Sequence, residues 1–233
     1  ETPDDPPSAL IVNSLYRLSH ELILKLASAG GKDHYLFEKV LSGYLEGHPA
    51  DFAIVPKEEI PSLKYPWDAL SVMERVLERL KGEVRGDVSE GAFLKGEVLV
   101  EEGASVAAGA HVYGPAYIGK GAFVGTSSLI RQTSLERGSL AGFGSEVARS
   151  LVGPRTQLHH AYVGDSVLGP DNWLGFRVVT ANRRFDKEAV DSRVKGREKS
   201  TGRGHFGCAI GPGCRLGINA MLMPGVLVGS RVT

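Results

Sequence analysis

The 233-residue chain carries 27 lysines and arginines against 27 aspartates and glutamates, so its formal net charge is zero. This balance argues against nucleic acid or an anionic membrane as a partner, since both require a positive field. No apolar run reaches the roughly 18 residues that span a bilayer. Two cysteines are too few for a disulfide framework, so we expect a cytoplasmic protein. The 30 glycines exceed the roughly 16 of average usage and indicate a turn-rich fold.

Residues 1–66 predict a small, partial α/β segment. Apolar runs at 9–18 and 50–55 read as strands. Helical spacing predicts one helix over 21–29, stopped by Gly30 and Gly31, and another over 33–48 with Asp33 as N-cap. The stretch PWDALSVMERVLERL then predicts a linking helix over 67–83, with Pro66 at its start.

From residue 84 the apolar positions recur every six residues, which fits neither an amphipathic helix nor an alternating strand. A short strand, a tight turn and stacking of successive turns explain this period, so we predict a parallel β-helix of hexapeptide repeats over 84–233. The large apolar positions are Val88, Leu94, Val100, Val106, Val112, Ile118, Val124 and Ile130, followed later by Ile210, Leu216, Leu222 and Val228. Small residues follow four positions after most of the first set: Ala92, Ala104, Ala110, Ala116, Ala122 and Ser128.

Two cysteines and one insertion depart from pure repeat packing. Cys208 and Cys214 share the small-residue phase, and we expect small buried hydrophobes rather than a disulfide. The rhythm weakens after Ile130 and is interrupted by an insertion at about 183–203, where eight basic residues face four acidic ones. This insertion is either a solvated loop or a basic arm that reaches toward phosphates, and its place after the histidine pair favours the arm. No Cys/His cluster has ligand spacing, so no metal site is expected.

Three stretches resemble the acetyltransferase half of the bifunctional sugar-1-phosphate nucleotidyltransferase/acetyltransferase family, in particular its archaeal-type members. They are HHAYVGDSVLG (159–169), TANRRFD (180–186) and LGINAMLMPGVLVG (216–229). The resemblance covers 84–233 and extends back through PSLKYPWDAL (61–70), which is similar to the end of the family's nucleotidyltransferase domain. It implies a mainly β chain with a left-handed β-helix of roughly 18 residues per coil. It also implies a homotrimer with active sites between neighbouring subunits.

The resemblance further implies an acetyl-CoA-dependent N-acetyltransferase for an amino-sugar 1-phosphate, with glucosamine 1-phosphate as the expected acceptor. The acceptor amine must lose a proton as it attacks, and histidine titrates near neutrality, so His159 is the implied general base. Tyr162 and Arg131 would contact the phosphate, and Asn182 the sugar. His160 matches no functional position and is expected to be a structural or surface residue. The implied cofactor-binding residues are Gly217, Asn219 and Ala220.

Several positions depart from the family pattern and leave alternatives open. Ala148 stands where the family has a phosphate-binding lysine, and the adjacent Arg149 should point to the other side of its strand. At two positions of the insertion where family members have lysines, this chain has Glu188 and Asp191. Lys187 and Lys195 are the nearby lysines that could take over their role. No glycine-rich nucleotide loop with Mg²⁺ carboxylates is present, so nucleotidyltransferase activity is not expected of this chain. The rival functions are a catalytically silent β-helix that trimerises and regulates a nucleotidyltransferase, and a sugar O-acetyltransferase that uses His159 but not Arg131.

Overall fold

The computed structural model describes residues 16–31, 33, 35–51, 54, 56 and 62–233. The chain divides into two compact units, Glu1–Pro56 and Lys57–Thr233, which are treated separately here. Among the described residues, no helix is both long and apolar enough to cross a membrane.

The N-terminal unit contains two helices that pack on each other, α1 (His20–Ala29) and α2 (Leu36–Leu45). The first matches the predicted helix: the Ser19 hydroxyl accepts the Leu22 N–H at its start, and Gly30 ends it with a φ of 39°. The second begins later than predicted. Asp33 is not its N-cap, because the Asp33 carboxylate accepts the N–H of Tyr35, and Tyr35 occupies the cap position without a side-chain hydrogen bond. The predicted strands at 9–18 and 50–55 fall largely outside the described residues, and their described positions are not in strands.

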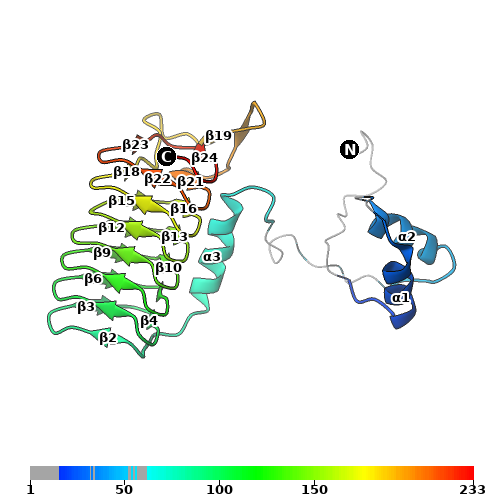
Figure 1. Cartoon of the computed structure of the whole chain (residues 1–233), viewed down its shortest axis with the longest axis horizontal. Coiled ribbons are helices and arrows are strands. Elements are labelled where there is room, and N and C mark those ends of the chain that lie inside the picture. Colours follow the sequence, from blue (N-terminus) through cyan, green and yellow to red (C-terminus); the bar gives the residue numbers. More distant parts are fainter. Residues whose placement is uncertain (1–15, 32, 34, 52–53, 55, 57–61) are drawn as a thin grey trace. The chain divides into compact units, whose positions relative to one another are not determined.

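The second unit is a left-handed parallel β-helix, as predicted. Its strands form three parallel sheets, here named A, B and C (Figure 1). Sheet A contains β1 (Glu83–Val84), β4 (Val98–Val100), β7 (Ala116–Ile118), β10 (Ser134–Leu135), β13 (Leu151–Val152), β16 (Val167–Leu168), β21 (Cys208–Ile210) and β24 (Val226–Val228). Sheet B contains β2 (Asp87–Val88), β5 (Ser105–Val106), β8 (Phe123–Val124), β11 (Leu140–Ala141), β14 (Gln157–Leu158), β17 (Trp173–Leu174) and β22 (Arg215–Leu216). Sheet C contains β3 (Phe93–Lys95), β6 (His111–Tyr113), β9 (Leu129–Arg131), β12 (Glu146–Ala148), β15 (Tyr162–Gly164), β18 (Val179–Thr180) and β23 (Met221–Leu222).

The predicted aliphatic positions fill the interior of this β-helix. From Val100 to Ile130 every one of them is fully buried, while Val88 and Leu94 are partly buried in the first coil. Each such side chain contributes about 1.5–3 kcal/mol relative to exposure. Cys208 and Cys214 are buried in the same core and are not disulfide-bonded, as predicted. Burial raises the pKa of the Cys208 thiol to about 12.

The repeat weakens after Ile130 because the coils lose residues at their corners, not because the β-helix ends. The register length of a coil falls from 18 residues, between Val98 and Ala116, to 16 residues, between Leu151 and Val167. The interior positions accordingly continue at Leu135, Ala141, Val147, Val152, Leu158, Val163, Leu168 and Leu174, all of them buried. Non-glycine residues take left-handed φ angles at the shortened corners: Gln132, Arg149, His160 and Asp165.

Helix α3 (Asp68–Glu78) lies along the outer face of sheet A (Figure 1). It is shorter than the predicted 67–83, and the first strand begins at Glu83. Its apolar side, including Leu70, Met73 and Leu77, packs with the outward residues of the sheet, such as Leu151.

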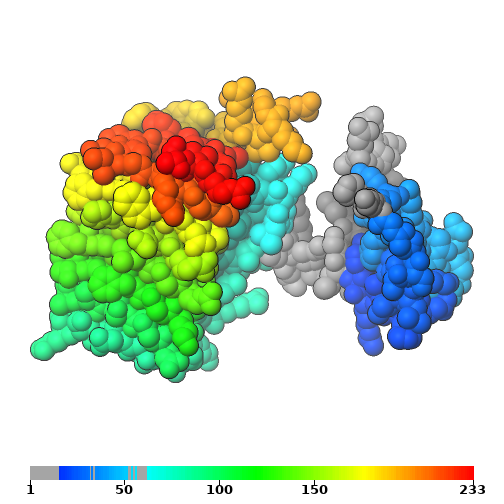
Figure 2. Space-filling view, viewed as in Figure 1, coloured from blue at the N-terminus to red at the C-terminus, as the bar shows by residue number. Residues whose placement is uncertain are grey.

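The insertion is an ordered element with its ends packed. It contains an antiparallel hairpin of β19 (Asp191–Val194) and β20 (Arg197–Ser200), joined by a turn at Lys195 and Gly196. Val190 before the hairpin and Phe206 after it are buried in the cluster that includes α3. The hairpin projects from the end of the β-helix that carries the C-terminus (Figure 2). Neither sequence-based alternative anticipated this packing.

Candidate active site

Two of the predicted substrate residues, Arg131 and Tyr162, lie on the outer face of sheet C, on strands separated by β12. Arg131 ends β9, Ala148 ends β12 and Gly164 ends β15, and these three residues are in register. Neighbouring strands are about 4.8 Å apart, so this column steps along the sheet at that spacing. Tyr162 begins β15 and faces outward with Gly164, whereas Val163 between them is fully buried. The β-helix thereby holds residues 31 positions apart in sequence on one surface.

Gly164 forms a cradle for two of the three predicted substrate residues, Tyr162 and Asn182. A Cβ atom at this position would lie 2.7 Å from Asn182 Nδ2 and 2.8 Å from the Tyr162 hydroxyl oxygen. Real Cβ contacts are not this short, so both polar groups can occupy this position only because residue 164 has no side chain. The structure therefore brings Tyr162 and Asn182 together over one point of the sheet.

The replacement Gly164→Ala is expected to displace Tyr162 and Asn182 without breaking the fold, since both meet the new methyl group with the ends of movable side chains. The KM for an amino-sugar phosphate should rise about 10-fold, which corresponds to one weakened hydrogen-bonding contact. The KM for acetyl-CoA should stay unchanged. Gly229→Ala is the matched control, because a Cβ there meets nothing within 4 Å. Equal kinetics for the two variants would contradict a role for this cradle.

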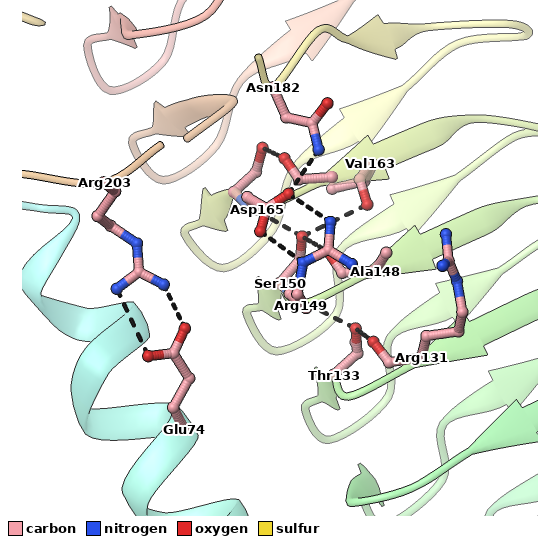
Figure 3. Close-up of polar contacts among 12 residues, drawn as sticks. Glu74, Arg131, Thr133, Ala148, Arg149, Ser150, Val163, Asp165, Asn182 and Arg203 are labelled. Atoms are coloured by element: carbon pink, nitrogen blue, oxygen red, sulfur yellow. Dashed lines mark hydrogen bonds and ion pairs between the residues drawn. The ribbon is translucent and has the colours of Figure 1, made fainter. Parts of the chain in front are cut away.

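The buried carboxylate of Asp165 is hydrogen-bonded to both Asn182 and Arg149 (Figure 3). Asp165 is 2% exposed and accepts two hydrogen bonds of 2.7 Å from Nε and Nη2 of Arg149. It also accepts a hydrogen bond from Asn182 Nδ2. The bond to Asp165 is the main reason that the pKa of Arg149 is raised.

The expected direction of Arg149 is therefore wrong. Arg149 follows the last residue of β12 and has a left-handed φ of 47°, so the alternation of side chains along a strand no longer applies to it. Its guanidinium therefore lies on the side of the sheet that carries Tyr162. The Tyr162 phenol is one of the groups that raise the pKa of Arg149.

Arg131 is at the end of β9, and its charge has a partner. Its Nη2 donates to the Glu146 carboxylate, and its Nε is buried without a hydrogen-bond partner. Glu146 begins the strand between β9 and β15 and is in register with Tyr162. Burial, together with the charge of Glu146, raises the pKa of the Tyr162 phenol. Tyr162 is therefore a neutral hydrogen-bond donor at physiological pH.

His159 stands at the corner between sheets B and C, three residues before Tyr162. Only three residues connect β14 to β15, whereas four connect the equivalent strands in the coils on either side. The His159 backbone is fixed by hydrogen bonds to Leu174 and from Arg177. Its ring is exposed and meets the Phe176 ring edge-on, with centroids 5.5 Å apart. The imidazole is thus not buried in the β-helix core, and it forms no ion pair with the residues that the structure describes.

His160, in contrast, is held by its neighbours. Its ring stacks between those of Phe143 and Phe176, with centroids 5.9 and 5.1 Å away. Its Nδ1 lies 2.9 Å from the Phe143 carbonyl oxygen. These contacts give His160 a structural role at the corner.

The residues implied for the cofactor lie on the same edge of the β-helix as His159. Gly217, Asn219 and Ala220 form the corner of the last coil, between β22 and β23. The Asn219 N–H donates to the Phe176 carbonyl, which joins this corner to the one that supports His159. Space beside Gly217 is open, because a Cβ there would meet nothing within 4 Å. The implied base and cofactor residues therefore share one edge.

A separate apolar groove of about 490 Å³ lies between α3 and sheet A. Among its lining residues are Leu63, Val72 and Val76 on one side and Leu99 and Tyr117 on the other. None of the predicted site residues lines it, and Glu136 is its one acidic member. We therefore place the candidate site on sheet C and its edges, where the polar groups converge.

Known proteins of one family are similar in sequence to this chain. The chain is 34% identical over 245 residues to the bifunctional protein GlmU of Methanocaldococcus jannaschii, covering 99% of this chain and 57% of that protein. It is 33% identical over 242 residues to the bifunctional sugar-1-phosphate nucleotidylyltransferase/acetyltransferase of Sulfurisphaera tokodaii, covering 99% and 58%. The chain belongs to this family.

The chain spans just over half the length of these family members and matches their C-terminal half. A GlmU of Methanococcus maripaludis is 42% identical over 169 residues, covering 72% of this chain and 41% of that protein. No family model matches. A perosamine N-acetyltransferase of Caulobacter crescentus aligns over 44% of this chain and 49% of its own at 24% identity, with a TM-score of 0.34.

The structure shows the surroundings of the positions that depart from the expected family pattern. Ala148 offers no cation beside Gly164, and the guanidinium of the next residue, Arg149, binds Asp165. In the insertion, Asp191 pairs with Arg184 at 3.2 Å. The side chains of Lys187 and Lys195 make no hydrogen bond or ion pair within the described part of the chain, and Lys195 lies at the hairpin turn.

Four residues that contact the candidate site were not predicted as site residues: Glu146, Asp165, Phe143 and Phe176. Asp165 directly follows the Tyr-Val-Gly stretch that carries the resemblance, so its position was a usable signal. The two phenylalanines gave none, because their contact with the histidine pair depends on the stacking of coils.

Proposed function

We propose that the chain is an acetyl-CoA-dependent N-acetyltransferase that acts on an amino-sugar 1-phosphate, with glucosamine 1-phosphate as its acceptor. The observation that carries this proposal is the pairing of an exposed imidazole, His159, with a polar cradle that begins three residues later. Family membership supports acetyl transfer. The residues that would bind the acceptor are those of the Gly164 cradle and Arg131.

Acetyl transfer here needs one base and no covalent intermediate on the protein. The neutral acceptor amine attacks the thioester carbonyl while His159 takes the amine proton. The carbon–sulfur bond then breaks, and the CoA sulfur leaves with a proton returned by the imidazolium. A cysteine nucleophile is not required. Both cysteines are buried, and the raised pKa of Cys208, about 12, leaves its thiol protonated.

The acceptor is recognised by neutral hydrogen bonds to its sugar and by a cation at its phosphate. Asn182 and the Tyr162 hydroxyl lie together over Gly164, where a sugar hydroxyl or phosphate oxygen would meet both. Arg131 uses Nη2 for Glu146, and a guanidinium has five donors, so others remain for a phosphate oxygen. The carboxylates of Glu146 and Asp165 offset the charges of Arg131 and Arg149.

The edge formed by Gly217, Asn219 and Ala220 is the proposed site of acetyl-CoA. Glycine and alanine permit close approach of an extended ligand arm to the backbone. In this proposal the protein is a homotrimer in the cytoplasm, and neighbouring subunits complete the site.

The test is release of CoA thiol from acetyl-CoA with glucosamine 1-phosphate, with glucose 1-phosphate, and without an acceptor. The proposal predicts release only with the amino sugar. Release with both sugars would indicate an O-acetyltransferase. No acceptor-dependent release would favour a silent β-helix that trimerises and regulates a nucleotidyltransferase.

Replacing Arg131 with alanine is expected to raise the KM for glucosamine 1-phosphate about 10- to 100-fold, the loss of one charge-assisted hydrogen bond. The KM for acetyl-CoA should remain constant. Arg85→Ala is the control, since Arg85 is also paired with carboxylates but lies in the first coil. Equal weakening of both substrates in Arg131→Ala would refute a phosphate contact.

A further inference from the structure

The chain that returns from the insertion is hydrogen-bonded to the candidate site. The Phe206 N–H donates to the Asn182 carbonyl at 2.9 Å, and the Gly207 N–H donates to the Asp165 carbonyl at the same distance. Asn182 is the last residue before the basic insertion, and Phe206 lies just after the insertion ends. The two ends of the insertion are therefore tied together directly beside the cradle over Gly164.

Phe206 is in turn anchored on α3. Its side chain is fully buried and meets the Trp67 ring at a centroid distance of 5.9 Å and an angle of 67°. Trp67 is 4% exposed and occupies the N-cap position of α3. An edge-to-face aromatic pair contributes stability beyond the burial of its area.

Polar contacts attach the same segment to α3 one helical turn further along. Arg203 donates through Nη1 to the Ser71 hydroxyl at 3.0 Å. Its Nη2 donates to the Glu74 carboxylate (Figure 3). The Arg203 carbonyl accepts the N–H of Val190, which is 1% exposed. Both arms of the insertion are thus fixed to the helix before the hairpin projects.

We propose that Arg203 and Phe206 are positioning residues, which hold Asn182 over Gly164 by docking the base of the insertion on α3. This inference rests on the proposed function in one respect, that Asn182 contacts the acceptor. Within the described part of the chain the Asn182 side chain has one hydrogen bond, to Asp165, so the backbone contact from Phe206 supplies much of its placement. In this view α3 supports the acceptor site as well as connecting two parts of the chain.

The test compares Arg203→Gln and Phe206→Leu in the full chain. Each should raise the KM for glucosamine 1-phosphate about 5- to 10-fold, because small misplacements of a contact group have large effects. The KM for acetyl-CoA should not change, and Arg203→Lys should give an intermediate value because it retains a cation opposite Glu74. Arg155→Gln is the matched control: it breaks a bidentate pair with Asp171 that is remote from Asn182.

Hydrogen exchange at the Phe206 and Gly207 amides provides a readout that does not depend on activity. Both variants should exchange these amides at least about 10-fold faster, as expected for a local opening. Faster exchange with an unchanged acceptor KM would overturn the positioning role, and so would unchanged exchange. If the wild-type chain shows no acceptor-dependent activity, the proposed function fails by itself. Exchange then decides the docking: faster exchange supports it and unchanged exchange overturns it.

Discussion

Replacing His159 with alanine is expected to lower kcat by about 100-fold or more, the usual effect of removing a positioned general base. The KM values should change little, because the cradle over Gly164 and the cofactor edge do not depend on the imidazole. The exposed ring makes no hydrogen bond or ion pair within the described residues, so its loss should leave the free energy of unfolding nearly unchanged. Initial rates of thiol release at saturating substrates and urea unfolding measure the two effects.

His160→Ala is the matched control for this experiment, because it removes the same kind of side chain from the adjacent position. His160 stacks on two phenylalanines and contacts a carbonyl, so its loss should lower stability and reduce kcat far less than His159→Ala. An unchanged kcat in His159→Ala, or equal losses in both variants, would rule out His159 as the base.

Replacing Asp165 with asparagine is expected to lower the free energy of unfolding by about 2–3 kcal/mol. Asp165 is 2% exposed, and the substitution removes the counter-ion of a guanidinium held by two hydrogen bonds. The expected cost lies below the roughly 3–5 kcal/mol of a fully buried pair. The reason is that 34% of the Arg149 side chain remains exposed to water. The measurement is urea unfolding at fixed protein concentration, since assembly would add a concentration-dependent term.

Asp171→Asn is the matched control, because it breaks an ion pair of the same geometry that is not buried. Asp171 accepts hydrogen bonds of 2.7 and 2.6 Å from Nε and Nη2 of Arg155, which reproduces the Asp165–Arg149 pair. Both partners are about half exposed, so water screens their attraction. The stability of Asp171→Asn should therefore be close to wild type. Similar losses in the two variants would show that burial of Asp165 is not what makes its pair matter.

The architecture could be predicted because the core of a β-helix is built from local repeats. Eight aliphatic residues in one phase defined the interior from Val88 to Ile130, and the small residues marked the corners. Prediction failed where a corner lost a residue. Glycine is the usual signal of a left-handed turn, but Gln132, Arg149 and Asp165 adopt that conformation here. The sequence gives no glycine signal at these corners, so the predicted direction of the Arg149 side chain was wrong.

The candidate site was predictable only in part because its ion pairs link different coils. The motif stretches identified His159, Tyr162 and Asn182, and the structure places the latter two together over Gly164. The carboxylate partners of Arg131 and Arg149 lie 15 and 16 residues away in sequence, a separation that acquires meaning only when the coil length is known. The contact of Phe206 with Trp67 joins positions still further apart in sequence, and no repeat in the sequence predicts it.

The most direct measurement follows the acetyl group itself. Isotope-labelled acetyl-CoA and glucosamine 1-phosphate are incubated with the wild-type chain and with His159→Ala, and the sugar product is examined by mass spectrometry and NMR. We expect the label on the sugar nitrogen with the wild-type chain, and formation about 100-fold slower or more with His159→Ala. Label on a sugar oxygen, no labelled sugar, or equal rates for both proteins would contradict a histidine-assisted transfer to the amine.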